Sequence, residues 1–201
     1  MPKTEETLSL WNLFKQGDWE AYTEIYNQNF KILNNYGHKF TRDVNLIEDA
    51  VHDLFIKLWT NKDNLATPVS VKNYLYKALR NIIFRKMQSQ SRFTEIEDEY
   101  PFSFEVSFDD IVISNEKEKE LQDKIKSVIK TLPPRQQEII YLRFYEGFNY
   151  PEIAEIMNIN ASSTYKLLYK ALNNMEVALK ASKLAIIWVL FCEFHQNHKI
   201  L

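Results

Sequence analysis

The chain has 201 residues, a length that suits one large domain or two small ones. Hydrophobic residues make up 45% of it and charged residues 26%, and the formal net charge of −2 gives no reason to expect a nucleic-acid partner. Three glycines and little strand-like alternation favour an all-α fold. The single cysteine, Cys192, excludes an internal disulfide and favours a reducing, cytoplasmic location, and we expect no signal peptide.

Apolar residues recur every three or four positions along the first ninety residues, which predicts four helices. We expect the first helix to end at Gly17 and the second to begin after Asp18, a good N-cap residue. The third helix covers about 46–60, and Ser70 can cap the fourth. Residues 88–114 have no clear period and are acidic, which makes them the best domain boundary.

Charge is unevenly distributed along the chain. No acidic residue lies between Asp63 and Glu95, and that interval holds a group of basic residues: Lys72, Lys77, Arg80, Arg85, Lys86 and Arg92. The next stretch, 94–120, reverses the sign and is strongly acidic. Such blocks usually mark separate electrostatic tasks, although a solvated surface explains many of them.

The fourth helix is expected to have a basic face with aromatic side chains. Projected at 100° per residue, the face opposite its apolar stripe carries Asn73, Lys77, Arg80, Phe84 and Gln88, flanked by Tyr76. Cations there could contact phosphates while an aromatic ring stacks on an unpaired base. The alternative is that Phe84 packs against another helix of its own domain. The third helix instead has an acid-leaning polar side, which suits a basic protein partner or simple solvation.

The second half begins near residue 115, and Pro133 and Pro134 end its first helix and start the next. Two closely spaced segments follow, 151–157 and 162–180. A short turn between helices, the second with a polar outer face, is typical of a helix-turn-helix. We place Tyr165 on the buried side of the second helix, with Asn160 or Ser162 as its N-cap. A plain helical hairpin with a solvated lysine face is the alternative.

Together these segments resemble the extracytoplasmic-function (ECF) group of bacterial RNA polymerase sigma factors, within the sigma-70 family. "LIEDAVHDLFIKLWTN" and "SVKNYLYKALRNIIFRKM" look like the promoter-melting domain, and "LPPRQQEIIYLRFYEGFNYPEIAEIMNINASSTYKLLYKAL" is similar to the domain that binds the upstream element. The resemblance covers roughly 8–92 and 115–178. It implies two small helical domains, 5–92 (region 2-like) and 115–180 (region 4-like), joined by an acidic linker, 93–114, and followed by an apolar extension, 181–201.

The resemblance also implies a function: binding core RNA polymerase and directing promoter recognition, strand opening and transcription initiation, with no catalytic residue, cofactor or metal. Expected partners are core polymerase through its β′ clamp helices and β flap, promoter DNA, and, as a candidate, an anti-sigma factor. Expected contacts with the duplex −35 element are Ser162, Ser163, Lys166, Lys170, Asn173, Arg135 and Arg143. Expected contacts with the single-stranded −10 element are Thr67, Ser70, Lys72, Asn73, Tyr76, Lys77, Arg80 and Phe84. Expected polymerase contacts are Asp49, His52, Asp53, Phe55 and Trp59.

Some features depart from the family pattern. His52 stands where glutamine is usual, Ala161 replaces a customary cap, and Tyr165 replaces a smaller apolar residue. In the extension, the apolar run 184–192 is shorter than the about 20 residues that a membrane span needs. We expect it to pack on the second domain or to contact a partner.

Two other functions fit part of the pattern. A stand-alone helix-turn-helix transcriptional regulator, binding duplex operator DNA as a dimer, would leave the basic aromatic helix without a role. A helical adaptor without a nucleic-acid partner would leave the charge segregation unexplained. We expect no enzyme, because the histidines lack metal-ligand spacing and no glycine-rich phosphate loop occurs.

Overall fold

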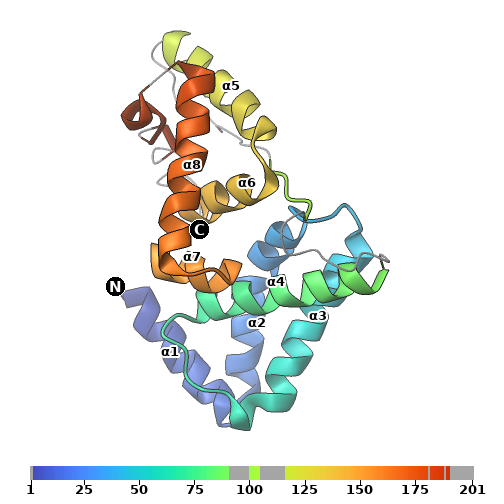
Figure 1. Ribbon diagram of the computed structural model, residues 1–201. Helices are drawn as coiled ribbons and strands as arrows, with labels where there is room; N and C mark the ends of the chain where they lie inside the picture. The colour runs from blue at the N-terminus through green and yellow to red at the C-terminus, as the bar shows by residue number, and fades with distance from the viewer. Residues whose placement is uncertain (1, 91–99, 105–115, 181, 188, 191–201) are drawn as a thin grey trace. The chain divides into compact units, whose positions relative to one another are not determined.

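The computed structural model describes residues 2–90, 100–104, 116–180, 182–187 and 189–190 (Figure 1). All regular elements in these ranges are helices, which confirms the predicted all-α class. The chain divides into two compact units, 1–97 and 98–201, and each is described by itself. No helix in the described ranges combines the length and the apolar character that crossing a membrane requires.

The first unit contains helices α1 (Pro2–Lys15), α2 (Trp19–Gly37), α3 (Val44–Asn61) and α4 (Val71–Gln90), with a single 3-10 turn, η1 (Lys62–Asn64), after α3. Helix α1 packs along α2, and α3 packs against both α2 and α4 (Figure 1). Helix α4 also contacts α1 and α2, so three neighbours surround it. The four helices predicted for this half are therefore confirmed.

The predicted helix boundaries of the first unit depend on short-range backbone chemistry. Gly17 ends α1 with a φ of +91°, a left-handed conformation that favours glycine. Asp18 caps α2, its carboxylate accepting a hydrogen bond from the Ala21 amide at 2.9 Å. Ser70 caps α4, its hydroxyl oxygen accepting from the Asn73 amide at 3.2 Å. All three predictions are confirmed.

The second unit contains α5 (Glu116–Thr131), α6 (Pro134–Ile140), α7 (Tyr150–Met157) and α8 (Ala161–Leu179). Helix α6 continues as a π-helix, η2 (Tyr141–Tyr145). Helices α5, α6 and α7 all pack against α8, which is the central helix of this unit (Figure 1).

The middle of the predicted linker belongs to the core of the second unit. Tyr100, Phe102 and Phe104 are all buried. The Phe104 ring lies 5.3 Å from the Tyr141 ring, and the Tyr100 hydroxyl donates a hydrogen bond to the Glu138 carboxylate. The aromatic residues in this acidic stretch thus anchor it by packing. The rest of the predicted linker, and the run 191–201 of the extension, lie outside the described residues.

Candidate nucleic-acid and protein interfaces

Helices α7 and α8 form the predicted helix-turn-helix. Asn149 and Glu152 make a capping box at the start of α7, with reciprocal hydrogen bonds of 3.0 and 2.8 Å between their side chains and backbone amides. Asn158 ends α7 with a φ of +52°. Asn160 then caps α8 by accepting from the Ser163 amide at 2.7 Å. Asn160 is thus the cap of the second helix, and the turn between the helices is three residues long.

The buried side of α8 differs from the prediction at one position. Thr164 is fully buried and its hydroxyl donates to the Asn160 carbonyl at 3.2 Å, whereas Tyr165 is 54% exposed. The prediction that Tyr165 is buried is therefore wrong. Thr164 lies one turn before Leu168, in the middle of the buried stripe, and Tyr165 falls at its edge, where the phenol can reach water.

The outer face of α8 combines polar, basic and aromatic side chains. Ser162, Lys166, Lys170 and Asn173 are exposed as predicted, and Ser163 is half-buried. Tyr165 and Tyr169 join them. The sequence prediction placed Tyr165 on the buried side of the helix and made no assignment for Tyr169. Their i, i+4 spacing, each followed by a lysine, was the signal available in the sequence.

The two arginines predicted to contact phosphates are both half-buried. Arg143 donates from Nη1 to the Phe148 carbonyl at 3.0 Å, and its guanidinium lies 5.2 Å from the centre of the Tyr150 ring. The Tyr150 ring in turn lies 4.2 Å from the Tyr165 ring. These contacts make Arg143 a support for the start of α8. Arg135 lies in the first turn of α6.

On α4, the predicted single-strand face is largely internal. Asn73, Tyr76 and Arg80 are buried, so the prediction that they are exposed is wrong. The Tyr76 ring packs at 4.7 Å against that of Tyr36 on α2. The error arises because a single apolar stripe was assumed, whereas α4 has neighbours on several sides.

Phe84 also belongs to this packed cluster. Its ring meets that of Phe40 edge to face at 5.4 Å, and the Arg80 guanidinium lies 4.2 Å from its centre. The alternative expectation, that Phe84 packs within its own domain, is therefore confirmed.

Replacing Phe84 with alanine is expected to destabilise the first unit, because it removes ring contacts with Phe40 and Arg80. The free energy of unfolding should fall by about 2 kcal/mol, less than for a fully buried ring. Thermal unfolding followed by circular dichroism measures the loss, with Gln88→Ala, on an exposed site of the same helix, as the control. An unchanged midpoint accompanied by lost promoter opening would instead assign Phe84 to DNA.

The other predicted single-strand residues lie before and early in α4. Thr67 is exposed and donates to the Asn12 side chain at 3.2 Å, and Ser70 is the α4 cap. Lys72 is half-buried with its ammonium 5.5 Å from the centre of the Tyr76 ring, and Lys77 is half-buried.

A groove of about 290 Å³ lies between α3 and α4. Its apolar walls include Leu58 and Ile82. Its polar groups come from both helices: Lys57, Asn61, Tyr74, Asn81 and Arg85. Burial raises the pKa of the Tyr74 phenol above its ordinary value. Among the residues that the structure describes, no carboxylate lines the groove.

This lining suits one unpaired base. The volume lies near the lower end of the about 300–1,000 Å³ typical of ligand pockets, which is too small for a strand but adequate for a single ring system. Side-chain amides can pair with base edges, apolar walls can contact ring faces, and cations can hold the adjoining phosphates. The sequence prediction omitted these residues, although the pairs 57/61 and 81/85 each have i, i+4 spacing.

A second groove, of about 350 Å³, lies between α2 and α3. It is aromatic, and its rim includes exposed Trp19 and Ile56. Phe55, predicted as a partner contact, is only 2% exposed and packs 4.8 Å from the Tyr26 ring. Phe55 nevertheless lines this groove, so a polymerase contact through it stays a prediction. Apolar grooves edged by tryptophan and tyrosine are typical protein-binding sites.

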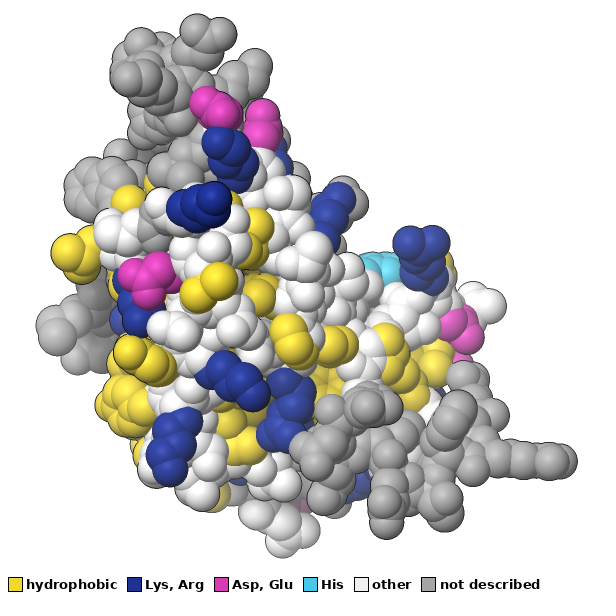
Figure 2. Space-filling model, turned by 45° about the horizontal axis from the view of Figure 1, so that its top comes forward, with side chains coloured by type: hydrophobic (Ala, Val, Ile, Leu, Met, Phe, Trp, Pro, Cys, Tyr) yellow, Lys and Arg dark blue, Asp and Glu magenta, His cyan; other side chains and the backbone are white. Residues whose placement is uncertain are grey.

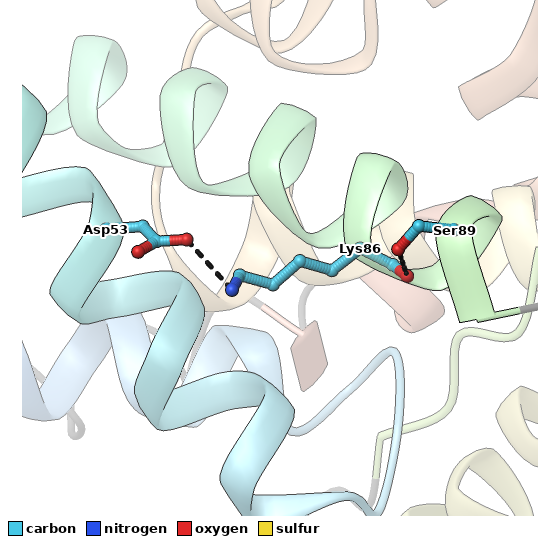
Figure 3. A network of polar contacts seen from close by, with 3 residues as sticks. All are labelled: Asp53, Lys86 and Ser89. Atoms are coloured by element: carbon cyan, nitrogen blue, oxygen red, sulfur yellow. Dashed lines mark hydrogen bonds and ion pairs between the residues drawn. The ribbon is translucent and has the colours of Figure 1, made fainter.

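Of the predicted polymerase-binding residues of α3, His52 and Phe55 line this groove. Asp49 and His52 are exposed, and His52 lines the groove. Asp53 forms an ion pair with Lys86 of α4 at 2.8 Å, and Figure 3 shows the two side chains extended toward each other. Trp59 is half-buried, with its ring 5.0 Å from that of Trp19. The acid-leaning face is thus partly neutralised at Asp53.

Basic and apolar side chains both reach the surface of the described residues. Figure 2 shows Lys and Arg side chains interspersed with hydrophobic ones on the face in view. Among the described residues, no group of histidine, cysteine or carboxylate side chains is placed to hold a metal ion.

Comparisons with known proteins agree with this architecture. Residues 25–93 match the family model described as sigma-70 region 2, and residues 122–175 match sigma-70, region 4. The chain is 28% identical over 138 residues to the RNA polymerase sigma factor SigV of Bacillus subtilis, covering 68% of this chain and 78% of SigV. It is 23% identical over 148 residues to the ECF RNA polymerase sigma factor SigM of Bacillus subtilis, covering 74% and 88%.

Two solved structures share the fold. One is CnrH in complex with the cytosolic domain of CnrY, with a TM-score of 0.55, 16% identity and coverage of 87% of this chain and 97% of that one. The other is the sigma factor RpoE in complex with the anti-sigma factor NepR from Bartonella quintana, with a TM-score of 0.56, 19% identity and coverage of 80% and 98%.

Proposed function

This chain belongs to the ECF group of the sigma-70 family and directs promoter recognition by RNA polymerase, and on that premise we propose how its described surfaces divide the work. The first unit holds unpaired promoter DNA and docks on the polymerase, and the second unit reads duplex DNA upstream. The chain itself carries out no bond chemistry. It acts in the cytoplasm, with the polymerase.

The α3/α4 groove carries this proposal, because it accounts for strand opening in the first unit. An unpaired base enters between Leu58 and Ile82, and Asn61 or Asn81 pairs with its edge. Lys57 and Arg85, both exposed at the groove, hold the neighbouring phosphates. Because a paired base cannot enter, this binding energy favours the open state over the closed duplex.

The α2/α3 groove is the proposed docking site for core RNA polymerase. Exposed Trp19 and Ile56 supply apolar contact area, and neighbouring Asp49 supplies negative charge toward a basic partner. This assignment follows the family resemblance, in which the corresponding helix docks on the β′ clamp helices. The groove and the base-binding groove open between different helix pairs, so docking and strand capture can be altered separately.

The outer face of α8 is the proposed duplex reader. Ser162 and Lys166, in its first turns, are exposed and can contact base edges and phosphates in the major groove. Because few cations lie on this face, we expect weak duplex binding by the chain without the polymerase. Since RpoE forms a complex with the anti-sigma factor NepR, we also propose an anti-sigma protein as a regulator of this chain.

Strand opening tests the proposed function. A promoter selected by the reconstituted holoenzyme is prepared with 2-aminopurine in its −10 element, where unstacking raises fluorescence. We expect a rise only when the chain and core polymerase are both present. An equal rise with core polymerase alone would contradict the proposed function. Sequence-specific duplex binding by the chain that is as strong without the polymerase as with it would favour a stand-alone regulator.

A further inference from the structure

Two exposed tyrosines lie side by side on the outer face of α8. Tyr165 is 54% exposed and Tyr169 is 63% exposed, and they are four residues apart on one face. Lys166 and Lys170 follow them directly, and no acidic residue occurs between Glu155 and Glu176. Exposed rings within a basic, acid-free stretch suit a nucleic acid better than a protein partner of mixed charge.

Tyr165 is held from the amino-terminal side of α8. The Tyr150 ring lies 4.2 Å from the Tyr165 ring at an angle of 30°. Tyr150 is itself held by the Arg143 guanidinium, 5.2 Å from its centre, and Arg143 is fixed by its hydrogen bond to the Phe148 carbonyl. The ring of Tyr165 is therefore set in place before any ligand arrives, which lowers the entropy cost of binding.

Tyr169 is held from the other side, by the segment that follows α8. The Lys183 ammonium lies 4.2 Å from the centre of the Tyr169 ring and 3.2 Å from the Glu176 carboxylate. The hydrogen bond with Tyr169, aided by Glu176, raises the pKa of Lys183 above its ordinary value. Ile186 and Leu190 of the same segment are buried, which anchors Lys183 in this position.

We propose that Tyr165 and Tyr169 determine specificity for thymine in the upstream promoter element, through ring contacts with its 5-methyl group, and that Tyr150 and Lys183 are the residues that position them. The thymine methyl is the apolar feature of the major groove, and apolar side chains on recognition helices read it. Rigid aromatic side chains make such contacts at low entropy cost. The inference rests on the proposed duplex-reading role of α8. Because Lys183 belongs to the carboxyl-terminal extension, the inference also gives the start of that extension a function in DNA reading.

Transcription from a library with a randomised upstream element tests the assignment. Holoenzyme with the unaltered chain should select thymine at one position read by Tyr165 and at another read by Tyr169. Tyr165→Ala and Tyr169→Ala should each lower the thymine preference at the matching position about 5- to 30-fold. The phenylalanine variants should keep the preference, because they keep the ring. Deoxyuridine at those positions, which lacks only the methyl, should weaken initiation by the unaltered chain and leave the matching alanine variant unaffected.

Variants of the two positioning residues, Tyr150 and Lys183, give a readout that a general folding defect would not give. Tyr150→Leu should relax only the position read by Tyr165, and Lys183→Met only the position read by Tyr169. Val177→Ala, on an exposed site two turns beyond Tyr169, is the matched control and should change neither. An equal loss at every position, or unchanged preferences with initiation intact, would overturn the inference while leaving the sigma-factor function in place. Unchanged preferences together with lost binding of an anti-sigma protein would assign this face to a protein.

Discussion

Replacing Ile56 with glutamate is expected to weaken binding of the chain to core RNA polymerase by about 30- to 1,000-fold. Ile56 is 53% exposed at the rim of the aromatic α2/α3 groove, so the substitution leaves the folded core intact. It would force a carboxylate into an interface that excludes water, and losses of about 2–4 kcal/mol are usual at such central contacts. Fluorescence anisotropy of the labelled chain titrated with core polymerase measures the change.

Val44 supplies a closely matched control for this prediction. It is β-branched, lies on the same helix and is 50% exposed, but it does not line the groove. Val44→Glu should therefore bind core polymerase normally. Normal binding by both variants would remove the α2/α3 groove as the docking site, and equal weakening of both would point to the whole exposed side of α3.

The second prediction concerns the α3/α4 groove. Ala78→Phe places a ring where we propose that the unpaired base enters, because Ala78 lines the groove. Loss of one stacked base costs about 1–3 kcal/mol, so the equilibrium for promoter opening should fall about 5- to 150-fold. Affinity for core polymerase should not change. The 2-aminopurine signal reports opening, and anisotropy reports assembly.

Gln88→Phe is the control for this substitution, since it adds the same ring to an exposed site of α4 outside the groove. It should open promoters as the unaltered chain does. A circular dichroism melt of Ala78→Phe confirms that α4 still packs. Normal opening by a folded Ala78→Phe chain would show that the base binds elsewhere, for example in the loop that contains Thr67.

Features set by neighbouring residues in the sequence were predictable. The caps at Asp18 and Ser70 and the glycine end of α1 depend on hydrogen bonds and φ angles within a few residues. The short turn between α7 and α8 is equally local. The family resemblance supplied the rest of the architecture, because it combines two such helical patterns in order.

Which side of a helix is buried was harder to predict, because that depends on how many neighbours the helix has. Tyr76 and Arg80 were placed outside by a single-stripe projection, yet α4 contacts three helices and buries both. The α3/α4 groove could not be predicted at all from one helix, since Asn61 and Asn81 come from facing helices. Likewise, Lys183 reaches Tyr169 only because the chain turns back on α8.

Transcription by purified core polymerase on a random-sequence library, with and without the chain, tests the central claim most directly. Sequencing of the transcript 5′ ends should show new start sites only when the chain is present. Those sites should share two upstream elements at a fixed spacing, one for each DNA-binding unit. The same distribution of start sites with and without the chain would contradict the account.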